Sequence, residues 1–233
     1  MALYANTNTP EKIFFNNASV KKMVFNGVEV WAESSGVAIS SCAAGTIVKV
    51  PESNGFVNYR LVDRDYLGNV LLVREVSAGT TQFGSKVSSA YSCKYKGTYL
   101  DGECTDFFEA LPGATRLAIQ QVSIPVRASA SSGATQDYLD RYCFCLSAVE
   151  WGLSGSQFEG EAVEYTAART KSAMHWTREV MGGMENFAYA INTSGERSNQ
   201  EYNAAKDFYP AFCVAKNQNV ALTGGIGEVE LVV

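Results

Sequence analysis

The feature that most constrains this fold is the stretch from residue 174 to residue 214, which has three strand patterns around two polar segments. Alternation of large apolar side chains with other residues is typical of half-buried strands. The strand patterns are Met174–Arg178, Phe187–Ile191 and Phe208–Val214, the last with Pro210 as an edge or strand-start residue. The segments between them, predicted as loops, are 179–186 and 196–207. The sequence therefore predicts a sheet that supports two irregular loops.

These two loops are the candidate binding face, because a rigid scaffold can hold variable loops in place. The alternative is that they are surface loops without a ligand. Large or polar side chains on or beside the loops are the candidate ligand contacts: Glu179, Met181, Met184, Asn186, Tyr189, Gln200, Tyr202 and Asn203. Trp176 and Phe212 are expected in the core instead.

Composition narrows the class of protein. The chain has 233 residues, of which 46% are hydrophobic and only 18% charged, against about 25% charged in an average soluble domain. Ser, Thr, Asn and Gly make up the difference, which favours a strand- and loop-rich protein. The net charge is -5 and there is no basic run, so we expect no binding to nucleic acid. We also expect no membrane insertion, because no apolar run approaches the ~18 residues that a spanning helix needs.

Six cysteines bear on the compartment: Cys42, Cys93, Cys104, Cys143, Cys145 and Cys213. The N-terminus lacks the basic and apolar regions of a secretory signal, so we expect synthesis in a cytoplasm and free thiols. Cys143 and Cys145 share one face of a predicted strand, a spacing that fits neither a redox pair nor a zinc ribbon. The single histidine, His175, is expected to be structural. We predict no metal, no cofactor and no catalytic residues.

The first 33 residues form a separate segment in this interpretation. Asn26-Gly27 between alternating apolar residues is a strong hairpin signal. So small a set of strands cannot bury its own apolar face, so it must pack on something else. Phe14, Phe15, Phe25 and Trp31 are the candidate attachment residues. The stretch 34–44, rich in Ser, Gly and Ala, is predicted as a linker.

The main domain is expected over 45–233. Three strands joined by turns are predicted at 46–50, 56–62 and 69–75, and a further strand at 141–146. Helical segments are predicted at 86–93, 98–111, 114–122 and 164–172. Ser147 is spaced three residues from Glu150, as in a capping box.

Several motifs together resemble a known group of proteins. In order along the chain they are Gly45–Lys49, Leu71–Arg74, Tyr99–Asp101, the Cys145-Leu146-Ser147-x-x-Glu150-x-Gly152 stretch, His175–Arg178 and Tyr209–Phe212. This series resembles an uncharacterised domain family common in phage and gut-bacterial proteins. That family is in turn similar to the C-type-lectin-like fold of phage receptor-binding tips and formylglycine-generating enzymes. The resemblance spans Gly45 to Val214 and implies an α+β C-type-lectin-like domain of short strands, helices and long loops.

Function follows from the resemblance as an expectation. The N-terminal segment is similar to attachment segments of phage tail and virion proteins, which implies a tail-associated virion protein made in the host cytoplasm. Such a protein is expected to display its binding face to a glycan or protein on the host surface. The implied partners also include other virion proteins and further copies of the chain in a homo-oligomer. One alternative is a purely structural virion protein, used in capsid decoration or tail assembly. Another is a formylglycine-type enzyme, which would need a pair of reactive cysteines in the lectin-like core, where Cys213 is expected to be a small buried hydrophobe instead.

Overall fold

The computed structural model describes residues 36–155, 158–223, 225 and 227–233, together with the backbone of four short strands near the N-terminus. Those strands are β1 (Phe14–Phe15), β2 (Ala18–Ser19), β3 (Lys22–Phe25) and β4 (Val28–Ala32). Strands β3 and β4 pair antiparallel with Phe25 opposite Val28, which confirms the predicted hairpin. The side chains of the candidate attachment residues Phe14, Phe15, Phe25 and Trp31 lie outside the described residues.

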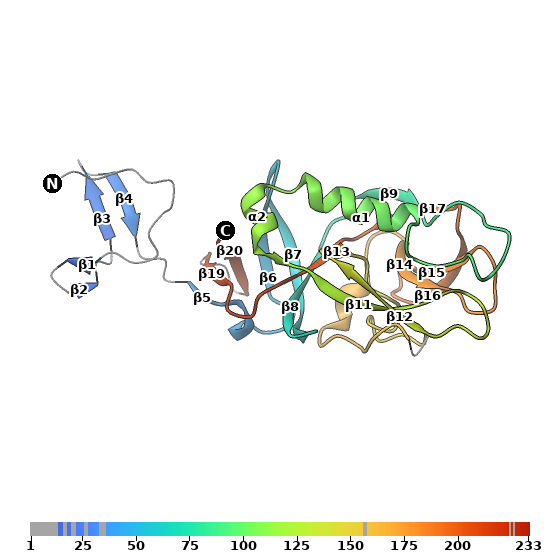
Figure 1. The fold of residues 1–233 in the computed structure, drawn as a ribbon. Helices are drawn as coiled ribbons and strands as arrows, with labels where there is room; N and C mark the ends of the chain where they lie inside the picture. Colours follow the sequence, from blue (N-terminus) through green and yellow to red (C-terminus); the bar gives the residue numbers. More distant parts are fainter. Residues whose placement is uncertain are drawn as a thin grey trace.

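A large sheet forms the half of the domain that holds β5 and the C-terminus (Figure 1). Its strands lie in the order β10-β18-β8-β7-β6-β20-β19-β5, with β13 also paired to β18. Their bounds are β5 Val37–Ala38, β6 Ile47–Glu52, β7 Gly55–Tyr66, β8 Asn69–Arg74, β10 Ile119–Gln120, β13 Cys143–Phe144, β18 Ala211–Val214, β19 Asn219–Leu222 and β20 Glu228–Leu231. All its pairs are antiparallel except β20 with β6. The predicted three-strand meander is confirmed as β6, β7 and β8.

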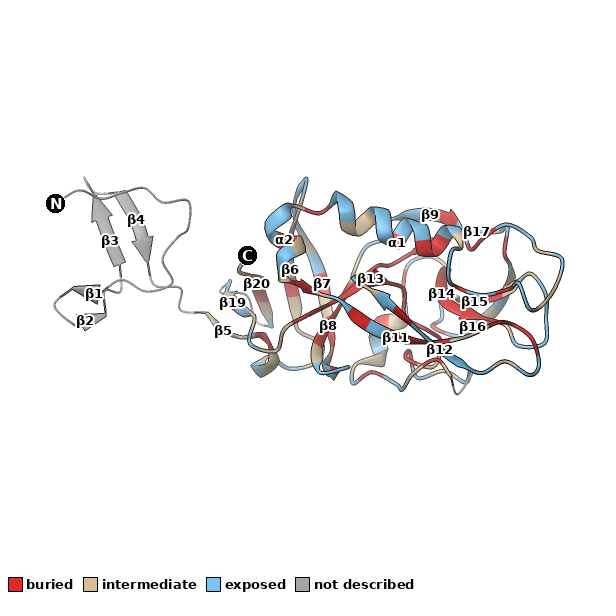
Figure 2. Ribbon diagram, in the orientation of Figure 1, coloured by how far each residue is buried: buried red, intermediate tan, exposed pale blue. Residues whose placement is uncertain are grey.

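Both faces of this sheet are buried. On β8, Val70 and Leu72 join one hydrophobic cluster, whereas Leu71 and Val73 join another on the opposite face. A strand covered on both faces is apolar throughout rather than alternating, as this one is. Figure 2 shows the buried residues following the strands through the middle of the domain.

A second sheet, in the order β16-β15-β14-β17-β9, lies at the other end of the domain (Figure 1). Its strands are β9 Gly79–Gln82, β14 His175–Val180, β15 Phe187–Ile191, β16 Arg197–Glu201 and β17 Ala205–Phe208. A hairpin of β11 (Val122–Arg127) and β12 (Gln136–Arg141) packs beside it. The predicted strands at 174–178 and 187–191 are confirmed. The predicted loop 196–207 is wrong, because β16 and β17 occupy most of it.

The third predicted strand, 208–214, is split between the two sheets. Phe208 ends β17 in the second sheet, and Ala211 begins β18 in the first. Tyr209 and Pro210 make the corner between them, which agrees with the prediction that Pro210 marks a strand start. This corner ties the two sheets together through buried backbone.

Two α-helices are found among the described residues, α1 (Tyr99–Ala110) and α2 (Gly113–Ala118), and neither is long and apolar enough to cross a membrane. The Thr98 side chain caps α1 by accepting a hydrogen bond from the backbone N–H of Asp101. Two short 3-10 helices lie at Ile39–Ser41 and Thr166–Arg169. The helix predicted at 98–111 is therefore present, whereas the one predicted at 114–122 ends at Ala118, because Ile119–Gln120 and Val122 belong to strands. Those predicted at 86–93 and 164–172 are wrong, since only turns and the second 3-10 helix form there.

The expected α+β, C-type-lectin-like fold class is wrong. About 40% of the chain lies in strands, arranged in several sheets, while the described helices are few and short. The predicted linker 34–44 also needs correction. Val37–Ala38 pairs with β19, and Ile39 is fully buried in the core of the large sheet. The folded domain therefore begins before Gly45, because these residues complete the edge of the sheet.

Candidate functional site

The candidate site is built on an irregularity in β14. Trp176 lies opposite Ala190 of β15, yet Val180 lies opposite Ala188, so β14 carries extra residues between two matched pairs. The Thr177 hydroxyl donates to the Tyr189 carbonyl at 2.8 Å and closes the gap in the ladder. Bulges of this kind redirect side chains and are common beside functional sites. Here the bulge places two consecutive charged residues, Arg178 and Glu179, in buried positions.

Arg178 is fully buried and is held by a carboxylate. Its Nη2 donates to Glu150 Oε1 at 2.7 Å, and its Nη1 donates to Glu150 Oε2. Further donations reach the backbone carbonyls of Cys145 at 3.2 Å, Pro125 at 3.0 Å and Glu159 at 3.2 Å. A bidentate contact and further acceptors for the two Nη groups offset the cost of burying these charges in a low-dielectric interior. The pair joins β14 to the turn that follows β13.

Glu150 is also the predicted capping residue. The Ser147 N–H donates to Glu150 Oε2 at 2.9 Å, and the Glu150 N–H donates to the Ser147 hydroxyl at 3.0 Å. The predicted capping box is therefore confirmed, although it closes a turn rather than a long helix. The Tyr66 hydroxyl donates to Glu150 Oε1 at 2.5 Å. This carboxylate thus serves a turn, a tyrosine and an arginine at once, which makes it a structural centre rather than a reactive group.

Glu159 is a second buried carboxylate beside this pair. Its Oε2 lies 3.8 Å from Arg178 Nε, and among the described residues neither atom has a hydrogen-bond partner. Burial raises the pKa of Glu159 to about 8, and Arg178 opposes that rise. The effect of burial on the Glu159 pKa exceeds that of Arg178, because the Arg178 guanidinium already makes its bidentate contact with Glu150. Glu159 Oε1 accepts from the Arg127 N–H at 2.8 Å, which links the buried cluster to the end of β11.

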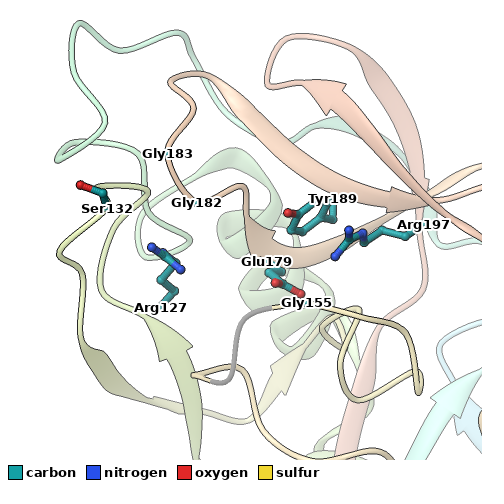
Figure 3. A pocket seen from close by; sticks show the side chains of 8 residues that line it. All are labelled: Arg127, Ser132, Gly155, Glu179, Gly182, Gly183, Tyr189 and Arg197. Carbon is teal, nitrogen blue, oxygen red and sulfur yellow. The ribbon is translucent and has the colours of Figure 1, made fainter.

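A polar cavity of about 360 Å³ opens next to this cluster, at the end of the domain that carries the second sheet. Its lining residues come from β11, β14, β15, β16 and the loops between strands: Arg127, Ser132, Gly155, Glu179, Gly182, Gly183, Tyr189 and Arg197. Figure 3 shows Arg127 and Arg197 reaching in from opposite sides, with Glu179 and Tyr189 between them. Two guanidinium groups against one carboxylate give the lining a positive balance in a chain that is negative overall.

Two glycines allow the loops to approach these charges closely. A Cβ at Gly155 would lie 2.7 Å from Glu179 Oε2, and a Cβ at Gly182 would lie 2.9 Å from the Arg127 guanidinium carbon. Real Cβ atoms do not tolerate such distances, so any other residue would push the loop or the charged side chain aside. Close backbone approach is a recurring role of glycine near binding sites. The shape of the cavity therefore depends on both positions.

Each arginine is fixed by its own contacts. Arg127 donates from Nε to the Ser129 carbonyl at 2.8 Å and from Nη2 to the Ser131 carbonyl at 2.9 Å, which holds that loop at the rim. Arg197 donates to the Ser154 carbonyl and lies over the Tyr189 ring, 4.3 Å from its centroid. These contacts orient both guanidinium groups at the cavity.

Of the predicted ligand contacts, the structure brings Glu179 and Tyr189 together in the cavity. Met181 and Met184 lie on the loop that follows β14, with Met184 42% exposed. Asn186 serves the fold, because its amide bonds both the N–H and the carbonyl of Val87. Gln200 and Asn203 lie on or just after β16, outside the cavity lining.

The prediction that Tyr202 lies on an exposed loop is wrong. Tyr202 is only 1% exposed and its ring lies 4.7 Å from that of Phe83. Glu179 is likewise buried, although its carboxylate lines the cavity. The expected core positions of Trp176 and Phe212 are confirmed, as is the structural place of His175, which is buried against the Tyr209 ring.

Sequence reasoning missed several lining residues, above all Arg127, Ser132 and Arg197. Arg197 falls in a stretch predicted as loop. Arg127 lies between Val126 and Ala128, outside the strands and helices predicted above, and a lone arginine was the only available signal. Because the two arginines are far apart along the chain, no local pattern could have paired them.

Several of the thiols lie in one core cluster. Cys104 Sγ lies 3.7 Å from Cys145 Sγ, and Cys143 packs in the same core cluster. Within the described part of the chain, no group of three or more His, Cys, Asp or Glu side chains has an arrangement that could hold a metal ion.

Comparison with known proteins gives a family without an assigned activity. Residues 67–216 match the family described as "Domain of unknown function (DUF6273)". No curated protein matches the chain. No solved structure matches it either. The match covers more than half of the 233 residues and includes every cavity-lining residue. The expected membership in a domain family of unknown function is therefore confirmed.

Proposed function

This chain belongs to the DUF6273 family of domains of unknown function, and we propose that it is a tail-associated phage virion protein that binds a host surface through the cavity described above. The observation that carries the proposal is the arrangement of the domain. Strand β5, the first of the large sheet along the chain, lies at one end of the domain, whereas the cavity-lining strands β14, β15 and β16 lie at the other (Figure 1). A protein anchored by its N-terminal segment would present this cavity outward.

The character of the cavity supports binding rather than turnover. The Glu150 carboxylate accepts hydrogen bonds from Arg178, from Tyr66 and from the Ser147 N–H of the capping turn. Glu179 and Tyr189 face the cavity between the two arginines, and the described lining residues include no histidine, cysteine or lysine. A cavity of this size with a few convergent polar groups is typical of a small-ligand site.

A second function, structural assembly in the virion, is favoured by a different surface. Leu117 is 86% exposed and Tyr142 is 40% exposed, and both line a groove of about 550 Å³ beside α2. Exposed apolar side chains gathered around a groove are typical of protein–protein contacts. In this alternative the domain fills an interface, and the polar cavity has no ligand.

Competition for adsorption separates the two functions. Purified full-length chain, added in excess to the host bacterium, should block adsorption of the phage that carries it. Arg197→Gln should block poorly, since it removes a cavity charge while keeping most of the side chain. Leu117→Ser should block as well as the unaltered chain. If the unaltered chain does not block adsorption, or if Leu117→Ser alone abolishes blocking, host binding through the cavity is wrong.

A further inference from the structure

We propose that the cavity lined by Arg127, Glu179, Tyr189 and Arg197 recognises a sugar residue that carries a carboxylate, such as a hexuronic acid. The inference deepens the proposed function and rests on it for the assumption that the ligand is a surface glycan. The ligand chemistry itself is argued from the lining residues.

The balance of charge favours an anion. Arg127 and Arg197 approach from opposite sides, and the single carboxylate of Glu179 lies between them (Figure 3). A guanidinium presents parallel N–H donors that match a carboxylate in both geometry and charge. Arg197 is the better candidate for this contact because it is exposed on β16 and stacked on Tyr189, so its plane is already oriented.

The remaining groups favour a ligand with hydroxyls. Ligand groups that contact an ionised Glu179 carboxylate must be donors, because a carboxylate only accepts hydrogen bonds. Tyr189 can donate or accept, and Ser132 likewise. Vicinal hydroxyls of a pyranose ring can both donate to and accept from such groups. A second anion would instead meet Glu179 with an unfavourable charge.

The lining also argues against a free amino acid or a peptide end. Those ligands offer a carboxylate and an ammonium, but they need apolar contacts for their side chains. Among the described lining residues none is aliphatic, and three are glycines. The cavity of about 360 Å³ is near the lower end of small-ligand sites, which suits one or two sugar rings.

The test compares two ligands that differ in one group. Methyl β-glucuronide carries a carboxylate where methyl β-glucoside carries a hydroxymethyl group. Each is titrated into the full-length chain and followed by NMR, with millimolar affinity expected for a single sugar ring, on the order of 1 mM. The glucuronide should bind at least ~10-fold more tightly, because it alone makes the charge-assisted contact with a guanidinium.

Variants assign the contact to the cavity. Arg197→Gln should weaken glucuronide binding at least ~10-fold and leave the weak glucoside binding nearly unchanged. Tyr189→Phe keeps the ring beneath Arg197 and should lose only the hydroxyl contact, a smaller effect. Arg64→Gln is the matched control, since Arg64 forms an exposed ion pair with Glu164 outside the cavity. Melting temperatures of all variants establish that each one is folded.

The outcomes separate this inference from the proposed function. Equal binding of both sugars, no binding of either at ~10 mM, tighter binding of free alanine, or unchanged affinity in folded Arg197→Gln would each overturn the acidic-sugar assignment. Host adsorption blocked by the chain would then still support the proposed function. Glucuronide binding without any blocking of adsorption would support the assignment and overturn the proposed function.

Discussion

Removing the charge from Glu150 should destabilise this protein more than almost any other isosteric change. The variant Glu150→Gln keeps the shape of the side chain but leaves the Arg178 guanidinium fully buried without its counter-ion. Breaking a buried pair by removing one partner costs about 3–5 kcal/mol, because the remaining charge is neither solvated nor paired. The other hydrogen-bond acceptors of Arg178 are backbone carbonyls, which cannot replace a full negative charge, and the Glu159 carboxylate lies 3.8 Å from Arg178 Nε, beyond hydrogen-bond distance.

Urea unfolding at pH 7 measures this cost directly. For a domain of this size, about 1 kcal/mol corresponds to about 2–4 °C in melting temperature, so a drop of roughly 6–20 °C should accompany the change. Arg64→Gln provides the control, because the exposed Arg64–Glu164 pair should contribute less than about 1 kcal/mol. Both changes remove one charge from an ion pair, so their difference isolates the effect of burial.

The double variant Arg178→Met/Glu150→Gln tests the reason for the loss. If the cost comes from an unpaired buried charge, removing both charges should cost less than the sum of the two single changes. Coupling of about 0.5–3 kcal/mol is typical of residues in one network. A Glu150→Gln variant within about 1 kcal/mol of the unaltered chain would refute the reasoning. Strict additivity in the double variant would do so as well.

Three further outcomes are expected. Burial raises the pKa of Glu159 to about 8 from its ordinary value of 4.5, so its protonated form stabilises the fold below pH ~4.5 and that contribution is lost as the pH rises through 8. When unfolding of the unaltered chain and of Glu159→Gln is compared from pH 5 to 9, the variant should gain stability relative to the unaltered chain as the pH rises. Parallel curves of unfolding free energy against pH would contradict this. Deleting 1–33 should leave a folded domain with an unchanged melting temperature, whereas deleting 1–44 should destabilise it by removing β5 and Ile39 from the sheet; unfolding of the shorter deletion would show that the N-terminal segment belongs to the core. In the native state a thiol reagent should label at most Cys42, the one half-buried cysteine, and it should label all six cysteines only after denaturation. The melting temperature should be the same with and without reductant. Rapid labelling of several thiols in the folded protein would contradict the buried cluster.

The strands were predictable wherever the local pattern carries the cause. β15 follows the alternation over Phe187–Ile191, and the meander of β6, β7 and β8 follows apolar runs separated by turn residues. The cap of α1 at Thr98 and the capping box at Ser147 depend on residues within one turn. Local hydrogen bonds and side-chain periodicity determine these features, so a single sequence contains enough information for them.

The fold class and the burial of charges were not predictable in this way. β14 has an alternating pattern typical of a half-buried strand, yet all six of its residues are buried, because β11 and α1 pack against it. Tyr202 lies in a polar stretch, but its ring is buried against Phe83 and the neighbouring core residues. In both cases the partner is distant in sequence, and the free energy of burying the side chain depends on that partner rather than on the neighbours along the chain.

The bulge in β14 explains why adjacent residues of one strand have separate roles. Arg178 lies in the interior and is neutralised by Glu150, so changes there act on stability and reach the cavity only through the fold. Glu179, the next residue, lines the cavity, so its carboxylate is a contact for whatever fills that space. In a regular ladder Arg178 and Glu179 would face opposite sides of the sheet. The extra residues of the bulge, which the hydrogen bond from the Thr177 hydroxyl to the Tyr189 carbonyl holds in place, allow both side chains to be buried. The stability of the pair therefore fixes the backbone from which Glu179 projects. On this argument, folded variants of the cavity residues should change binding at constant melting temperature, while variants of the pair should change both.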